Sequence, residues 1–289
     1  MRPALQIAQW VILSTTTAFH FGSSLVTEDS FSPATELTSR KVDIPVLRIM
    51  PLGGSITAGS GDEPKGKENG YRKPLRDEFR HRQHVVNMVG CGKLGSMKDN
   101  DHEGHPGALT EEIKGFAKCS INFKPNVVLI NAGTNDAKQG GQVLFCPFLQ
   151  RSFTPNSKKG PEFVNGTYER MKDIIEYLYT ESYGVTVILS TLLPQTDSVG
   201  NANVRIINGR YRQLVSYLKS EGKKIYLAEM NDGFINAQDL ADGTHPTHKS
   251  YPKIAAVWAY ALGQALADGK VCQPLKISNV GKFADDEPV

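Results

Sequence analysis

Short apolar runs alternate along the chain with longer segments in which apolar residues recur every three or four positions. Runs of the first kind are typical of strands covered on both faces, and segments of the second kind are typical of helices with one apolar face. Strands are therefore predicted over residues 46–52, 84–90, 126–131, 185–193 and 225–230. Helices are predicted over residues 71–82, from Thr110 onward with Thr110 as the cap, and over 163–179, 204–219 and 250–266.

This alternation predicts the fold class. Strands that alternate with helices favour a three-layer α/β/α sandwich around a five-stranded parallel sheet. Residues 96–107 contain too few apolar side chains to form an element and are expected to be a long loop. Residues 60–69 and 140–160 are also expected to be loops, and the tail beyond Lys270 is polar.

The length and composition favour one domain, because 289 residues with 39% hydrophobic content can bury a single large core. That domain is expected over residues 45–289, after an N-terminal segment over 1–44. Residues 1–24 have the features of a secretory signal peptide, with Arg2 as the only early charge and an apolar stretch from Trp10. Secretion is the expectation, and a disordered or membrane-tethered N-terminus is the alternative. A stable transmembrane helix is not expected, because it needs about 20 mostly apolar residues.

The charge balance bears on partners. Lys and Arg total 33 against 30 for Asp and Glu, which gives a net charge of +3. This value is too close to balance to indicate a nucleic acid or an anionic membrane as partner. A monomer that acts on a small substrate is expected.

Four cysteines are widely spaced, at positions 91, 119, 146 and 272, and no two form a Cys-x-x-Cys pair. A zinc site or a thioredoxin-like motif is therefore not expected. In a secreted protein the cysteines could form two disulfides, for which the sequence leaves three connectivities open; in the cytosol they would be buried thiols. Asn165-Gly166-Thr167 is a glycosylation sequon that matters only in a secreted protein.

Candidate chemistry begins directly after the first predicted strand, at Gly53-Gly54-Ser55. The glycines allow a tight turn, which would expose the Ser55 hydroxyl at the carboxyl end of the strand. The alternative is a strand-to-helix turn in which Ser55 is only a helix cap.

Two further polar groups follow other predicted strands, and parallel strands bring their carboxyl ends to one edge of the sheet. Asn135 follows the third predicted strand, and Asp242 and His245 follow the fifth. A turn of this length can bring the carboxylate against the imidazole, which would then act as the base for Ser55. The alternative for Asp242 is an ordinary Asp-Gly turn, but it gives His245 no role.

Asn135 and Gly107 are candidates for an oxyanion hole, as a side-chain amide donor and an unobstructed backbone N–H. Asn135 could instead cap the next helix. His102, Glu103 and His105 could suggest a metal site, but three ligands within four loop residues are better interpreted as solvated or hydrogen-bonded loop groups.

The motifs resemble those of the SGNH (GDSL-like) hydrolase superfamily over about residues 47–266. The matching blocks are Gly53-Gly54-Ser55-Ile56-Thr57, Gly133-Thr134-Asn135-Asp136 and Asp242-Gly243-Thr244-His245-Pro246. A narrower similarity to carbohydrate esterase family 3, which includes acetyl xylan esterases, is carried by Ile49-Met50-Pro51-Leu52-Gly53, Gly70-Tyr71-Arg72, Gly95-Ser96-Met97 and Asp101-His102-Glu103-Gly104-His105-Pro106-Gly107.

The resemblance implies a flavodoxin-like fold with Ser55 as nucleophile and Asp242 and His245 as its partners. It implies an oxyanion hole formed by the Ser55 backbone N–H, Gly107 and Asn135, and no metal or organic cofactor. The chain departs from the superfamily at Gly54, where an Asp usually precedes the nucleophile. That Asp is not a triad member, so its absence bears on catalytic rate and substrate preference.

The expected activity is hydrolysis of acyl esters, acetyl esters first, on a carbohydrate through an acyl-enzyme. One alternative keeps the triad in a lipase, a lysophospholipase or a general short-chain esterase. An alternative from another class is a non-catalytic carbohydrate-binding or structural secreted protein, for which Gly54 is the sequence argument.

Overall fold

The five predicted apolar runs form the centre of one sheet in the computed structural model, which describes residues 44–138 and 161–277. Their side chains are buried almost throughout. The strands are β1 (Leu47–Gly53), β2 (Val86–Met88), β5 (Val127–Asn131), β6 (Thr186–Ser190) and β7 (Ile225–Ala228). They are all parallel and lie in the order β2-β1-β5-β6-β7. The predicted α/β sandwich is therefore confirmed.

Two further strands bring the sheet to seven and correct the prediction that residues 96–107 form no element. β4 (Asp101–Gly104) pairs in parallel with the end of β1, and β3 (Gly92–Lys93) pairs antiparallel with β4. Most of β4 is polar yet buried, and hydrogen bonds compensate for the burial. His102 Nδ1 accepts the Gly104 N–H at 2.9 Å, and Glu103 accepts the Cys91 N–H at 3.0 Å. Apolar content alone could not reveal such a strand.

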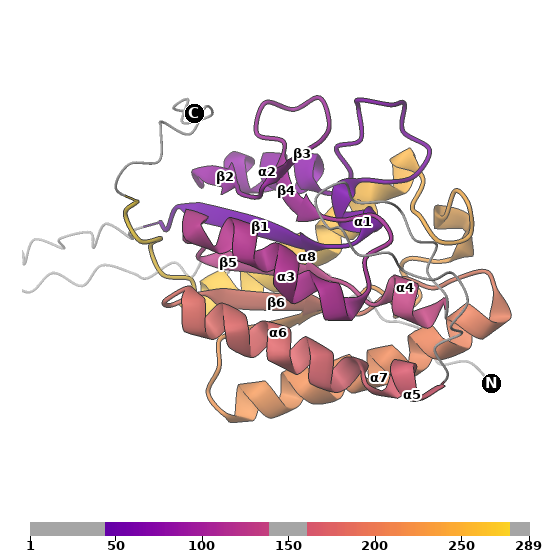
Figure 1. Ribbon diagram of the computed structural model, residues 1–289. Coiled ribbons are helices and arrows are strands. Elements are labelled where there is room, and N and C mark those ends of the chain that lie inside the picture. The colour runs from indigo at the N-terminus through magenta and orange to yellow at the C-terminus, as the bar shows by residue number, and fades with distance from the viewer. Residues whose placement is uncertain (1–43, 139–160, 278–289) are drawn as a thin grey trace, which may run out of the picture. The chain divides into compact units, whose positions relative to one another are not determined.

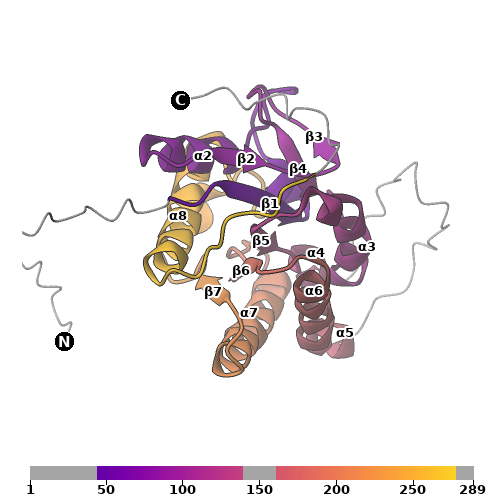
Figure 2. The same ribbon diagram turned by 90° about the vertical axis from the view of Figure 1, so that its left-hand side faces the viewer.

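Helices cover both faces of the sheet (Figures 1 and 2). α2 (Arg72–His81) and α8 (Tyr251–Ala267) pack on one face, and α3 (Thr110–Ser120), α6 (Thr167–Glu181) and α7 (Ser198–Ser220) pack on the other. Short helices α1 (Ser55–Ala58) and α4 (Thr134–Ala137) follow β1 and β5, and α5 (Pro161–Asn165) precedes α6. Single 3-10 turns occupy Ile121–Phe123, Ala237–Asp239 and His248–Ser250.

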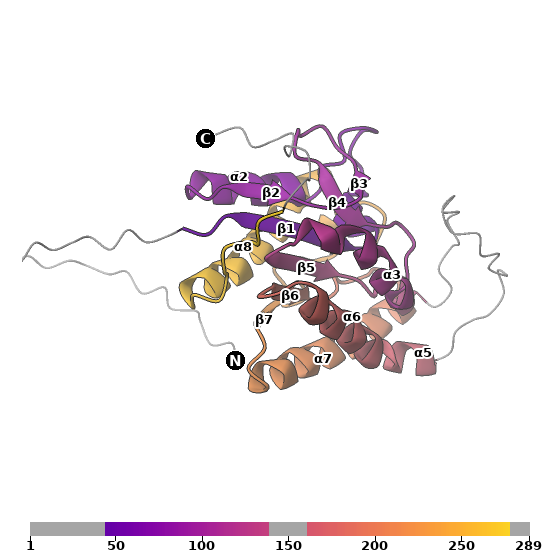
Figure 3. The same cartoon turned by 60° about the vertical axis from the view of Figure 1, so that its left-hand side comes forward.

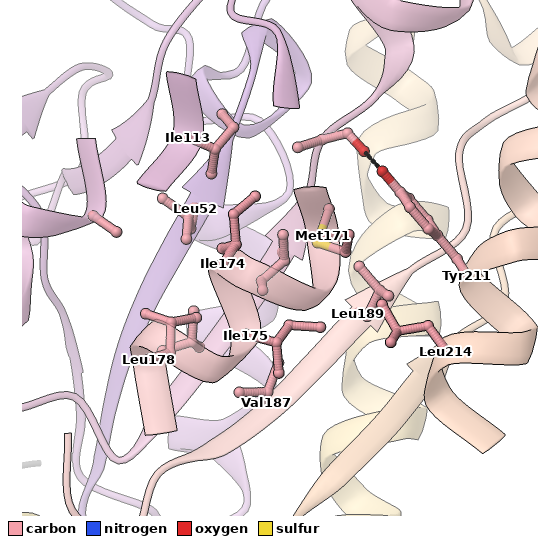
Figure 4. Close-up of a cluster of buried hydrophobic side chains, with 14 of the residues drawn as sticks. Leu52, Ile113, Met171, Ile174, Ile175, Leu178, Val187, Leu189, Tyr211 and Leu214 are labelled. Atoms are coloured by element: carbon pink, nitrogen blue, oxygen red, sulfur yellow. Dashed lines mark hydrogen bonds between the residues drawn. The ribbon is translucent and has the colours of Figure 1, made fainter. Parts of the chain in front are cut away.

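Apolar side chains from the sheet and the helices form the core between the layers. Figure 4 shows the cluster beneath α6, where Leu52 and Leu189 of the sheet lie near Ile174, Ile175 and Leu214 of the helices; all five are fully buried or nearly so. Burying a side chain of this size contributes about 1.5–3 kcal/mol. Tyr211 is also buried in this cluster, and its hydroxyl donates to the Ala132 carbonyl at 2.9 Å.

Three helix boundaries differ from the prediction. α7 begins six residues earlier than expected, because the Asp197 carboxylate accepts the N–H groups of Val199 and Gly200 and caps the helix. The predicted helix over 163–179 is two helices, which meet at Gly166. Thr110 is the first residue of α3 rather than its cap, and its hydroxyl hydrogen-bonds to Asp136.

The chain after α8 returns along the amino-terminal ends of the strands (Figure 3). Asn126, just before β5, donates to the Cys272 carbonyl at 2.7 Å, and the Val46 N–H donates to Gln273 Oε1 at 3.1 Å. Thr186, the first residue of β6, donates to the Lys270 carbonyl at 2.8 Å. These contacts fasten residues 270–273 through backbone, amide and hydroxyl groups.

A disulfide joins Cys91 to Cys119, with a sequence separation of 28 residues. It links the turn between β2 and β3 to the end of α3. Cys272 is exposed and forms no disulfide with another described residue. The candidate signal peptide, Cys146, the expected loop over 140–160 and residues 278–289 lie outside the described part of the chain.

The described residues fall within one contact unit, Asp43–Val289. Among them, no helix is long and apolar enough to cross a membrane.

Candidate active site

The nucleophile candidate, Ser55, is the first residue of α1, directly after the turn that ends β1. This turn packs closely against β5: the Gly54 N–H donates to the Asn131 carbonyl at 3.2 Å, and a Cβ on Gly53 would lie only 2.0 Å from that oxygen. Only glycine fits at Gly53. Ser55 lies at the carboxyl edge of the sheet, and it is largely buried, with 9% of the residue exposed.

The loop after β7 folds into a tight turn that carries Asp242 and His245. Leu240 and Pro246 form an isolated antiparallel bridge, and the Ala241 N–H donates to the His245 carbonyl at 2.7 Å. Within the turn, Gly243 has a φ of 82°, in the left-handed region that favours glycine. The Gly243 carbonyl accepts the Thr196 N–H at 3.1 Å, which holds the turn against the chain that follows β6.

Ser55, His245 and Asp242 form one hydrogen-bonded chain. The His245 Nδ1 atom lies 2.7 Å from Asp242 Oδ2, and its Nε2 atom lies 2.8 Å from Ser55 Oγ. Because a carboxylate only accepts, Nδ1 carries the proton, which leaves Nε2 to accept the Ser55 hydroxyl proton. The structure thus brings together three residues that the sequence analysis singled out, although Ser55 and His245 are 190 positions apart.

Asp242 is held as a carboxylate. Partial desolvation raises the pKa of this exposed side chain, but hydrogen bonds from the His245 N–H and ring, the proximity of His245 and the Thr244 N–H outweigh it and bring the pKa to about 2. The second oxygen, Oδ1, accepts the N–H groups of His245 and Thr244 at 2.8 and 3.0 Å. At neutral pH an ionised Asp242 can fix the imidazole orientation and stabilise a positive charge on it.

Asn135 lies on α4, beside the turn that carries Ser55. Its Nδ2 atom donates to the Ala108 carbonyl at 2.9 Å and lies 3.7 Å from the position that a Cβ on Gly54 would occupy. One N–H of the side-chain amide is thereby fixed. The other has no hydrogen-bond partner among the residues that the structure describes, which leaves it for an oxygen bound next to Ser55, as an oxyanion hole requires.

Two glycines near Ala108 differ in whether their N–H groups are free for a ligand. The Gly104 N–H donates to His102 Nδ1, and a Cβ on Gly104 would lie 2.4 Å from the Ala58 nitrogen, so this residue packs β4 against α1. Gly107 is half-buried in the turn between His105 and Ala108, with a φ of 83°. Within the described ranges the Gly107 N–H has no hydrogen-bond partner, so Gly107, which the sequence analysis selected, remains the better candidate for a backbone donor.

Glu103 and His105 are hydrogen-bonded to each other, as expected, although Glu103 lies in a strand rather than a loop. Glu103 Oε1 lies 2.5 Å from His105 Nε2, and its other oxygen accepts from Cys91 and Ser120. The His105 ring stacks on Phe116 with ring centroids 3.6 Å apart. These contacts fix the start of the turn that carries Gly107.

One group among the described residues brings three candidate metal ligands together: Cys91, Glu103 and Cys119. The two sulfur atoms are bonded to each other as a disulfide, so neither is a thiolate, the form that binds metal. This group therefore does not fit a metal ion.

Arg72 is a residue whose role the sequence analysis missed. It is fully buried, and its guanidinium donates to the carbonyls of Ala58, Glu68, Leu94 and Asn100 at 2.8–3.1 Å. Burial lowers the pKa of Arg72 to about 10. Arg72 ties the end of α1 to two neighbouring loops, and only its place in the Gly-Tyr-Arg block could have drawn attention to it.

Comparisons with solved structures show the same fold. The chain is similar to a family 3 carbohydrate esterase of Clostridium thermocellum, at 23% identity and a TM-score of 0.62, over 78% of this chain and 99% of that one. A family 3 carbohydrate esterase from Talaromyces cellulolyticus matches at 21% identity and a TM-score of 0.58, over 77% and 99% of the two chains. A mutant acetyl esterase, solved with an acetate ion, matches at 20% identity and a TM-score of 0.59, over 78% and 100% of the two chains.

Sequence comparisons place the chain in a family. It is 24% identical over 242 residues to a multidomain esterase of Ruminococcus flavefaciens, a match that covers 73% of this chain but only 28% of that protein. Residues 52–252, well over half of the chain, match the GDSL-like Lipase/Acylhydrolase family. The chain therefore belongs to the GDSL-like lipase/acylhydrolase family.

Proposed function

We propose that this member of the acylhydrolase family is a serine esterase that removes acetyl groups from a carbohydrate through a Ser-His-Asp triad. The observation that carries the proposal is the hydrogen-bonded chain from Ser55 through His245 to Asp242, with His245 2.8 Å from Ser55 and 2.7 Å from Asp242. A serine hydroxyl is unreactive on its own, and this arrangement supplies the base that it needs.

In the proposed reaction, His245 Nε2 takes the Ser55 proton as Oγ attacks the ester carbonyl. The negative oxygen that develops is stabilised by the Ser55 backbone N–H, the Gly107 N–H and the Asn135 amide. His245 then gives its proton to the leaving sugar oxygen. A water molecule, deprotonated by His245, then attacks the acyl-enzyme. As the bond between the acyl carbon and Ser55 Oγ breaks, His245 returns the proton to Oγ and acetate leaves.

The acetyl and carbohydrate assignment is supported by the family 3 carbohydrate esterases and the acetyl esterase that share this fold. The motif blocks of the sequence support the same substrate class. A substrate panel tests it: acetylated xylan, acetylated monosaccharides, and p-nitrophenyl esters of increasing acyl length. The proposal predicts the highest kcat/KM for acetyl esters.

A preference for long acyl chains in that panel would instead support a lipase or lysophospholipase. A kcat/KM for simple short-chain p-nitrophenyl esters that equals or exceeds the value for the acetylated carbohydrates would support a general short-chain esterase. The match to an acylhydrolase family and the hydrogen-bonded chain at Ser55 argue against the non-catalytic alternative, and turnover of any ester in the panel would exclude it.

We also propose that the protein is secreted and monomeric and needs no cofactor. The Cys91–Cys119 disulfide supports secretion, since disulfides persist in oxidising compartments. The mass of the secreted protein tests this: a mass that corresponds to cleavage near residue 24 would support removal of a signal peptide.

A further inference from the structure

Asp136, next to Asn135 on α4, is a fully buried carboxylate outside the proposed triad. Its Oδ2 atom accepts the Thr110 N–H at 3.0 Å, and its Oδ1 atom accepts the Thr110 hydroxyl at 2.6 Å. Burial raises the pKa of Asp136, while the Thr110 hydrogen bonds and the charge of Arg170 oppose that rise. The carboxylate therefore makes its main contacts with the first residue of α3.

Arg170 of α6 completes the cluster. Its guanidinium donates to Asp136 Oδ1 at 3.2 Å, to the Thr110 hydroxyl at 2.8 Å and to the Phe163 carbonyl at 2.5 Å. Removing a buried charge of this kind or one of its partners leaves polar groups unsatisfied. Asp136, Thr110 and Arg170 thus join α4, α3 and α6 at one point.

This point lies between the two segments that carry the proposed oxyanion donors. Gly107 is three residues before Thr110, and Asn135 is directly before Asp136. The Asn135 amide also reaches the Ala108 carbonyl at 2.9 Å. The segment with Gly107 is fixed independently, because the His105 N–H donates to the Gly53 carbonyl at 2.8 Å and its ring to Glu103. The single-turn helix α4 is held to this segment and to the start of α3, because Asn135 bonds to the Ala108 carbonyl and Asp136 bonds to Thr110.

We propose that Asp136 is a positioning residue that holds Asn135 at the place where its amide meets the developing oxyanion. This inference rests on the proposed serine esterase mechanism. Asp136 touches neither Ser55 nor the reacting atoms; it acts by fixing α4 against α3. The geometry must be accurate, because a donor displaced by about 1 Å can cost about a hundredfold in rate.

The test uses Asp136→Asn in the full-length protein, with p-nitrophenyl acetate as substrate. Asparagine keeps the shape of the side chain but has one acceptor oxygen instead of two. The amide NH₂ group that replaces the second oxygen then faces a donor of Thr110 or Arg170, and that donor loses its acceptor. We expect kcat to fall about 10- to 100-fold while KM changes less than about threefold. Far-UV circular dichroism and thermal unfolding establish that the variant is folded.

Two milder variants keep the test valid if Asp136→Asn does not fold. Thr110→Val removes only the hydroxyl donor and should lower kcat by roughly three- to tenfold, about the effect of one hydrogen bond. Thr110→Ser retains both donors to Asp136 and should keep kcat close to that of the wild type.

A double-mutant cycle separates positioning from a general structural effect. Asn135→Ala alone should lower kcat by about 10²- to 10³-fold. If Asp136 acts through Asn135, Asp136→Asn should lower kcat less than about threefold further in that background. The same fold loss in both backgrounds, or wild-type kcat in a folded Asp136→Asn variant, would overturn the inference.

Failure of the proposed mechanism would look different. In that case Ser55→Ala or Asn135→Ala alone would leave turnover near the wild-type level, before any Asp136 variant is considered. Loss of activity in those two variants, with no effect of Asp136→Asn, would reject only the positioning role.

Discussion

Gly53 and Gly54, which precede Ser55, differ in whether the structure requires a glycine. A Cβ on Gly53 would lie 2.0 Å from the Asn131 carbonyl oxygen, so a side chain is excluded there. A Cβ on Gly54 would meet Asn135 Nδ2 at 3.7 Å and the His105 carbonyl at 3.8 Å, which are ordinary contacts. The backbone at Gly54 has a φ of −95°, outside the left-handed region. Position 54 therefore has room for a Cβ.

The two positions should therefore respond oppositely to alanine. Gly54→Ala should change the free energy of unfolding by less than about 1 kcal/mol and leave kcat within about threefold of the wild type. Gly53→Ala should destabilise the protein by about 1–3 kcal/mol or more, because backbone must move. Urea unfolding and p-nitrophenyl acetate hydrolysis measure both effects, and equal stability of the two variants would contradict this account.

Some site residues could be predicted from the sequence and others could not. Ser55, Asn135 and the turn with Asp242 and His245 each follow a buried strand, and parallel strands gather their ends at one edge. Arg72 and Asp136 could not be assigned a role, because burial of a charged side chain depends on partners contributed by distant segments.

At the scale of elements, β4 is a strand that the pattern of apolar residues cannot predict, because its buried side chains are polar. His102 and Glu103 are buried in this strand at 5% and 1% exposure. Glu103 meets three hydrogen-bonding partners, whereas His102 uses Nδ1 for the Gly104 N–H, and its buried Nε2 has no partner in the part of the chain that the structure describes. Burial, followed by the charges of Arg72 and His105, lowers the pKa of His102 to about 3. His102 is therefore neutral in the folded protein at mildly acidic pH.

This makes stability depend on pH. Below its ordinary pKa of 6.5, His102 takes up a proton in the unfolded chain but not in the folded one until about pH 3, so the free energy of unfolding should fall over that window. His102→Asn keeps an acceptor for the Gly104 N–H and removes the titration. Between pH 7.5 and 5.0, the wild type should lose about 2 kcal/mol more stability than the variant. Equal losses in urea unfolding at the two pH values would show that His102 does not carry this dependence.

At the scale of the whole molecule, the five predicted strands lie parallel in one sheet, as the sequence predicts, whereas the pairing of Cys91 with Cys119 could be settled only by the fold. The sheet brings the turn before β3 next to the end of α3, and Cys91 and Cys119 meet there. The sequence left three connectivities open because cysteine spacing does not reveal which segments are neighbours. Secretion and glycosylation of Asn165, an exposed residue at the end of α5, stay predictions.

The disulfide should matter for stability and little for catalysis. A bond that closes a 28-residue separation is expected to contribute about 3.5 kcal/mol by restricting the unfolded chain. Cys91→Ser with Cys119→Ser should lower the free energy of unfolding by up to this amount, measured in guanidinium, while kcat at 25 °C stays within about threefold. A large loss of kcat in the folded double variant would mean that the bond also fixes Glu103 and the turn with Gly107.

The central claim is that Ser55 is the nucleophile of a hydrolase whose base is His245. The most direct measurement is the rate of acetate release from an acetylated substrate by the wild type and by folded Ser55→Ala. The account predicts a loss of roughly 10³-fold or more in the variant, since no other group replaces the attacking oxygen. Turnover within tenfold of the wild type would contradict it.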